Sequence, residues 1–99
     1  MSFEVHLKLE AHQDIFEAIL WYESKRDGLG GEFYLEIEKV KNLLRKNPDL
    51  FEIKYKNIVR WVQTERFPYI VVFVIDVSKV VILAVVSTHR NPKIWKERI

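Results

Sequence analysis

The chain has 99 residues, which is enough for one compact domain, residues 1–99, and too few for a second. Hydrophobic residues make up 48% of it and aromatic residues 13%, which argues against disorder, and the absence of cysteine excludes disulfides and thiolate metal sites. Residues 1–50 carry 7 Lys/Arg against 10 Asp/Glu (net −3), whereas residues 51–99 carry 9 against 4 (net +5). The C-terminal half is therefore where an acidic partner or a phosphate backbone would be drawn.

The first segment, residues 3–9, alternates apolar and polar side chains at every step. A period of two predicts a strand that buries one face. That face would carry Phe3, Val5, Leu7 and Leu9.

Two amphipathic helices are predicted next. Residues 12–24 repeat apolar side chains at helical spacing, and Asp27-Gly28 ends this helix. After a turn at residues 28–31, a second helix runs to Asn47-Pro48, because the residue before proline leaves the helical region. Its apolar positions are Phe33, Ile37, Val40 and Leu44. The loop between the helices is short, so we expect an antiparallel hairpin.

The remainder reads as strands at residues 51–55, 58–65, 69–75 and 80–87. Lys56-Asn57 and residues 76–79 are the expected tight turns. Such short connections leave no room for crossovers, so these strands should form an antiparallel meander. The pairing partner of the first strand is left open.

The expected fold class is thus α+β, with the helical hairpin packed on one face of the sheet. The opposite face would be bare or covered only by the C-terminal tail, and a binding function would be located there. Parallel crossovers, or helices over both surfaces, would contradict this arrangement.

We expect a cytoplasmic protein without a membrane segment. The N-terminus has no basic start followed by a long apolar run, and residues 69–75 are too few to span a bilayer as a helix. No metal site or cofactor is expected, since His6 and His12 have no ligand-spaced partners and no cysteine is present.

Several short motifs together resemble the RelE/ParE toxin superfamily over nearly the whole chain. In order they are Trp21-Tyr22-Glu23, Gly28-Leu29-Gly30 followed by Phe33, Asn47-Pro48, Arg66-Phe67-Pro68-Tyr69, Ile82-Leu83-Ala84-Val85 and Arg90-Asn91-Pro92-Lys93-Ile94-Trp95. Each motif alone is weak, and their joint order and spacing carries the resemblance.

The resemblance implies a RelE/ParE-like fold and the toxin component of a type II toxin–antitoxin system, of the plasmid-stabilisation type, that inhibits growth. It implies a cognate antitoxin partner, and either a homodimer or a toxin–antitoxin hetero-oligomer. ParE-like members act on DNA gyrase, and the motifs are more typical of that branch. RelE-like members cut mRNA on the ribosome. An inactive member that only binds its antitoxin is the third alternative.

For a RelE-like ribonuclease, the resemblance assigns catalytic positions that this chain fills poorly. The two lysine positions fall at about Trp61 and Gln63, the first arginine at Ile70 and the tyrosine at Trp95. Only the arginine after the last strand is retained, at Arg90. Indole, amide and aliphatic groups do not shuttle protons, so we expect binding in preference to catalysis.

Another basic set is the alternative for a ribonuclease site. Its candidate catalytic residues are Arg60, Arg66, His89 and Arg90, with His89 as acid or base near neutral pH. Candidate contacts on the basic face are Lys54, Lys56, Lys93 and Trp95.

The antitoxin is expected to contact the helical hairpin. An amphipathic antitoxin tail would lay its apolar side along the helices or add to a sheet edge. The candidate contacts are Trp21, Phe33 and Tyr34, and the alternative is that these rings are core.

Overall fold

The computed structural model describes residues 2–99 as three helices, one 3-10 turn and one five-stranded sheet. The elements are β1 (Glu4–Leu7), α1 (Leu9–Lys25), α2 (Leu29–Lys46), η1 (Pro48–Leu50), β2 (Ile53–Tyr55), β3 (Val59–Gln63), β4 (Tyr69–Asp76), β5 (Lys79–Ser87) and α3 (Lys93–Lys96). Among the described residues, no helix is both long and apolar enough to cross a membrane.

The sheet has the strand order β1-β5-β4-β3-β2. Strands β2 to β5 form the expected antiparallel meander, in which Val71 pairs with Val62 on one side and with Val85 on the other. Strand β1 runs parallel to β5, with Val5 opposite Val80. This pair is a parallel crossover, and it resolves the pairing that the sequence left open. The expectation that any parallel crossover would contradict the arrangement is therefore wrong, because the helical hairpin inside this crossover still covers one face of the sheet only.

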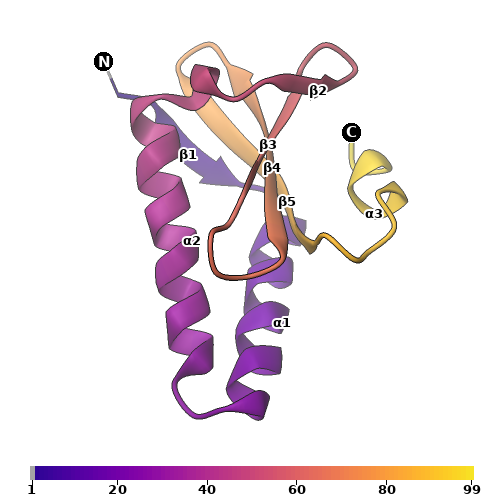
Figure 1. Ribbon diagram of the computed structural model, residues 1–99. Coiled ribbons are helices and arrows are strands. Elements are labelled where there is room, and N and C mark those ends of the chain that lie inside the picture. The colour runs from indigo at the N-terminus through magenta and orange to yellow at the C-terminus, as the bar shows by residue number, and fades with distance from the viewer. Residues whose placement is uncertain (1) are drawn as a thin grey trace.

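The sheet separates two apolar clusters, and Figure 1 shows it between the helical hairpin and α3. The larger cluster joins α1 and α2 to the sheet through side chains such as Phe33, Ile37 and Phe73. The smaller one lies on the opposite face, where Trp95 of α3 packs on Val72 and other strand residues. Alternation along each strand supplies both faces. The second face is therefore partly covered by the C-terminal tail.

The helices begin earlier than their periodicity predicts. Leu9 is the first residue of α1 and is 69% exposed, so its expected place on the buried face of a strand is wrong. The strand ends at Leu7, and Lys8 already provides the carbonyl that accepts from the amide of His12. A regular alternation that continues into a helix start gives no boundary by itself.

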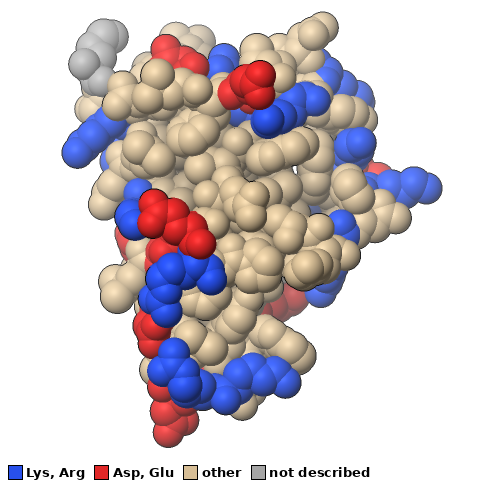
Figure 2. Space-filling model, in the orientation of Figure 1, with Lys and Arg blue, Asp and Glu red and all other residues tan. Residues whose placement is uncertain are grey.

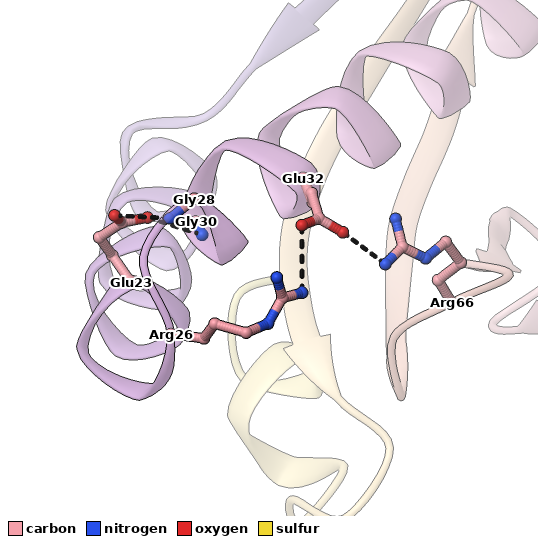
Figure 3. A network of polar contacts seen from close by, with 6 residues as sticks. All are labelled: Glu23, Arg26, Gly28, Gly30, Glu32 and Arg66. Atoms are coloured by element: carbon pink, nitrogen blue, oxygen red, sulfur yellow. Dashed lines mark hydrogen bonds and ion pairs between the residues drawn. The ribbon is translucent and has the colours of Figure 1, made fainter.

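The turn between the helices is shorter than the four residues expected, because Glu23 caps the second helix (Figure 3). Its carboxylate accepts hydrogen bonds from the amides of Gly28 at 2.9 Å and Gly30 at 3.0 Å. These are amides that a helix start leaves without intrahelical partners, and a negative charge is favourable there. Gly28 has a φ of 89°, whereas Gly30 and Gly31 already lie within α2.

Gly30 has a packing role and no turn role. A Cβ at this position would lie 2.6 Å from the carbonyl oxygen of Ile19, so only glycine lets α2 approach α1 so closely. Gly31, the next residue, has open space at the same point. The Trp-Tyr-Glu and Gly-Leu-Gly motifs are thus explained by the joint between the two helices.

Polar contacts fix the β3–β4 turn to α2. Arg66 donates to Glu32 at 2.6 Å, and Arg26 donates to the same carboxylate at 3.1 Å (Figure 3). The hydrogen bond from Arg66 is the largest influence that lowers the pKa of Glu32, and Arg26 adds to it. Beneath them, the buried carboxylate of Glu36 accepts the amide of Glu65 at 2.9 Å.

A bidentate, partly buried ion pair holds the C-terminal segment on α1. Arg98 donates to both carboxylate oxygens of Asp14, at 2.6 and 3.1 Å, and to the carbonyl of Leu83 at 3.2 Å. The same carboxylate accepts the amide of Val85 at 2.9 Å, next to the irregularity in the β4–β5 register. Hydrogen bonding to Asp14 raises the pKa of Arg98. Bidentate pairs of this kind are among the stronger polar contacts in proteins.

Candidate functional site

The second face of the sheet carries an aromatic cluster centred on Trp95. The ring of Trp95 meets Tyr55 edge-on at 5.4 Å and Trp61 at 5.5 Å between centroids. Trp95 is only 2% exposed, so this predicted surface contact is instead the anchor that holds α3 on the sheet. Large rings in such edge-to-face packing contribute both area and geometry.

A groove of about 320 Å³ lies beside this cluster. It is lined by Lys54, Tyr55, Trp61, Gln63, Ile70, Val86, Ser87, Thr88, Arg90, Pro92, Trp95 and Lys96. We call it the second-face groove. Its charged side chains are all cations, and none of its lining residues within 2–99 carries a carboxylate. The charge that the lining residues carry is therefore positive.

The groove brings together all five positions that the ribonuclease resemblance assigns, namely Trp61, Gln63, Ile70, Arg90 and Trp95. They come from β3, from β4 and from the segment after β5. Cleavage through a 2′-hydroxyl requires one group to accept a proton and another to supply one. Indole, amide and isoleucine side chains do neither near neutral pH, and the arginine stays protonated. The five positions therefore meet in one groove, and four of them hold side chains that do not transfer protons; Lys54, Tyr55 and Lys96 line the groove at other positions.

The alternative basic set is not brought together. Arg60 lies on the side of β3 opposite Trp61, and its guanidinium donates to the carbonyls of Phe51 at 2.7 Å and Asp49 at 3.3 Å. Arg66 is held by Glu32 at the helical hairpin. Both guanidinium groups therefore form structural hydrogen bonds, and neither residue lines the groove that contains Arg90.

His89 and Arg90 follow β5 in an exposed loop. The amide of His89 donates to the hydroxyl of Ser87 at 3.2 Å. The side chain of His89 is not among those that line the second-face groove. Arg90 lines the second-face groove and also a further groove beside α1, and it forms no ion pair within 4.0 Å among residues 2–99. Of the four candidates, Arg90 is the one at the groove.

Lysines surround the aromatic cluster. The ammonium of Lys54 lies 5.6 Å from the centroid of Trp61 and that of Lys56 lies 5.5 Å from Tyr55, whereas Lys93 is exposed on α3. Lys96, which the sequence reasoning missed, lies 4.8 Å from Tyr55. Its spacing of three residues from Lys93 was the available signal, since α3 then presents both near one another. In Figure 2 blue side chains predominate along the right edge, where Figure 1 places α3 and the β2–β3 turn.

The three hairpin candidates divide between core and surface. Phe33 is fully buried and stacks on Tyr22 at 5.4 Å, so for Phe33 the core alternative holds. Trp21 is 56% and Tyr34 47% exposed. Leu9, Phe16 and Leu20, which sequence reasoning missed as surface residues, are also more than half exposed on α1. Leu9, Phe16 and Leu20 share one face of α1, and Trp21 lies on the neighbouring face toward the C-terminal segment; we call the four together the α1 apolar stripe.

A second groove, of about 590 Å³, separates α1 from the C-terminal segment. Trp21 and Glu17 line it from α1, and Tyr69, Arg90 and Arg98 line it from the other side. Burial raises the pKa of the Tyr69 hydroxyl. Within residues 2–99, no three His, Asp or Glu side chains lie close enough together to hold a metal ion.

Comparison with known proteins rests on structure. No family model and no curated protein matches the chain. A solved structure described as "Chromosomal ParDE TA system from P. aeruginosa" contains a chain that superposes with a TM-score of 0.72. The match covers 87% of this chain and 96% of that one. The two chains share one fold. Their sequence identity is 17%, so the likeness to the ParDE chain concerns architecture, and it confirms the expected α+β, RelE/ParE-like fold.

Proposed function

We propose that this chain is the toxin of a type II toxin–antitoxin pair and that it acts by binding its target, without cutting RNA. The shared ParDE fold and the ordered motifs from Trp21 to Trp95 support the toxin role. A cytoplasmic location follows from such a role, because the targets of these toxins are intracellular.

One observation carries the choice of binding over catalysis. The second-face groove collects the five positions where a RelE-like ribonuclease needs its catalytic groups, and four of them hold Trp61, Gln63, Ile70 and Trp95. General acid–base catalysis typically contributes about 10²–10⁴-fold to a rate, so the loss of these groups from the assigned positions argues against a RelE-like nuclease, although Lys54, Tyr55 and Lys96 line the groove at other positions. Arg90 remains and supplies charge.

The proposed target is DNA gyrase, as in ParE-like toxins. The test is a supercoiling assay with purified gyrase and increasing amounts of the chain, with mRNA cleavage on ribosomes measured in parallel. We expect inhibited supercoiling and intact mRNA. Full supercoiling at a large molar excess of the chain would refute the gyrase target. Cleavage that disappears when His89 and Arg90 are both changed to alanine would instead establish the ribonuclease alternative.

The proposed partner is an antitoxin that docks on the helical hairpin through the α1 apolar stripe and Tyr34. Apolar side chains that are about half or more exposed on one hairpin provide the surface that an amphipathic helix covers. Phe16→Glu with Leu20→Glu should keep the fold and growth inhibition, because both side chains are exposed, and should abolish neutralisation by the antitoxin. A matched control is Leu50→Glu with Val77→Glu, at exposed positions away from the hairpin.

Neutralisation of the Phe16/Leu20 variant at wild-type antitoxin levels would show that the antitoxin docks elsewhere. Expression of the unmodified chain without any effect on growth would favour the third alternative, an inactive member that only binds its antitoxin.

A further inference from the structure

We infer that the ligand of the second-face groove is an acidic protein segment that carries an apolar side chain, and that single-stranded nucleic acid does not bind there. The inference rests on the proposed function, since it describes the surface through which a non-catalytic toxin would hold its target. It starts from the charge of the groove, which is lined by Lys54, Arg90 and Lys96 without an opposing carboxylate among residues 2–99.

The cations of the groove are available to a partner. Arg90 has no ion-pair partner within 4.0 Å among the described residues. Lys54 contacts Glu52 at 3.1 Å, but the Glu52 side chain is 81% exposed. Exposed pairs of this kind contribute little, so a carboxylate of the partner can replace Glu52 without a large penalty.

The aromatic rings argue against nucleic acid. A base binds to a single-strand site by stacking flat on an aromatic face, which must be free. Tyr55 is approached by the ammonium groups of Lys56 and Lys96 at 5.5 and 4.8 Å, and by the edge of Trp95. Trp61 is approached by Lys54 and by Trp95. Each of these two rings thus already has a lysine and another ring beside it, which disfavours the flat stacking of a base.

The aliphatic lining of the groove determines the second feature of the ligand, its apolar side chain. Ile70 and Val86 are the aliphatic side chains that line the groove, together with the cations. A volume of about 320 Å³ is at the lower end for binding pockets and suits one large apolar side chain. A peptide with an apolar residue flanked by Asp or Glu would place the apolar side chain on the aliphatic lining and its carboxylates near the cations.

Isothermal titration calorimetry with three probes tests the inference. The first is a short capped peptide in which aspartates and leucines alternate, the second is the same peptide with asparagine in place of aspartate, and the third is single-stranded oligothymidine. We expect the acidic peptide to bind, its affinity to fall as NaCl is raised, and the other two to bind at least about tenfold more weakly.

The variant Lys54→Gln with Lys96→Gln should weaken binding of the acidic peptide about tenfold. Lys25→Gln with Lys39→Gln removes the same charge from the hairpin and should leave the affinity unchanged. If the first variant fails to fold, the comparison of the three probes on the wild-type chain decides by itself.

Tighter binding of oligothymidine than of the acidic peptide, or equal binding of the acidic and asparagine peptides, would overturn the inference. Equal affinity of the folded Lys54/Lys96 variant would do the same. Failure of the proposed function is seen separately, as an absence of growth inhibition or as cleaved mRNA, whatever the peptides show.

Discussion

At the scale of single residues, the joint between α1 and α2 depends on side chains that serve the backbone. Glu23 accepts the amides of Gly28 and Gly30, and Gly30 lets the carbonyl of Ile19 lie where a side chain would otherwise be. The resemblance motifs at this joint therefore report on architecture. The contacts of Glu23, Gly28 and Gly30 explain how the fold forms, and the preference for a gyrase target rests on the resemblance of these motifs to the ParE-like branch.

Gly30→Ala should destabilise the protein, because the added methyl group would lie 2.6 Å from the Ile19 oxygen and force the helices apart. Overpacking of this kind costs about 1–3 kcal/mol. The matched control is Gly31→Ala, which meets open space in α2 and should raise stability by up to about 1 kcal/mol. Urea unfolding of the two variants measures both effects, and equal stabilities would contradict the packing role of Gly30.

The pKa of Glu32 gives a pH-dependent prediction. Since Arg66 and Arg26 lower the pKa of this carboxyl in the folded state, its contribution to stability is present above the ordinary glutamate pKa. The contribution is lost as the pH falls through the lowered folded-state value. Glu32→Gln should therefore reduce stability at neutral pH and have no such effect in strong acid. The measurement is the urea midpoint of the wild-type and Glu32→Gln proteins at pH values from strong acid to neutral. A difference between the two midpoints that stays the same at every pH would contradict the prediction.

At the scale of elements, α3 is the least predictable part and the most consequential for the site. It has four residues, too few for a helical period to be visible, whereas the long helices and the alternating strands of the meander could be predicted. The parallel β1–β5 pair could not be predicted either, because it joins residues 75 apart, such as Val5 and Val80, through a long connection.

Trp95→Ala should release α3 from the sheet, because Trp95 supplies the packing of this element on Tyr55 and Trp61. Loss of a buried tryptophan typically costs about 3–5 kcal/mol, and here part of the cost is local to the tail. Trp21→Ala, at a position 56% exposed, should cost less than about 1 kcal/mol. Hydrogen exchange of residues 93–98 reports on the release. Unchanged protection in the Trp95 variant would show that the ion pair of Arg98 and Asp14 suffices.

At the scale of the whole molecule, the sheet separates two surfaces of different chemistry. The hairpin side carries the α1 apolar stripe, and the opposite side carries the cationic second-face groove. The two surfaces meet at one place, because Trp21 and Arg90 line the same groove between α1 and the C-terminal segment.

The sequence predicted the meander, whose strand order brings Trp61, Gln63 and Ile70 together, but it did not predict that these positions share one groove with Arg90 and Trp95. It could not predict that Arg60 and Arg66 are occupied by backbone carbonyls and by Glu32, since those contacts depend on η1 and on the α2 surface. Nor could it place Lys96, whose position follows from the docking of Trp95.

The central claim, a toxin that binds without cutting, is tested most directly by the integrity of transcripts in cells whose growth stops on expression of this chain. The account predicts growth arrest with full-length mRNA, relieved by co-expression of the antitoxin. Fragmented mRNA that accompanies arrest, and that is lost together with arrest in Arg90→Ala, would contradict it.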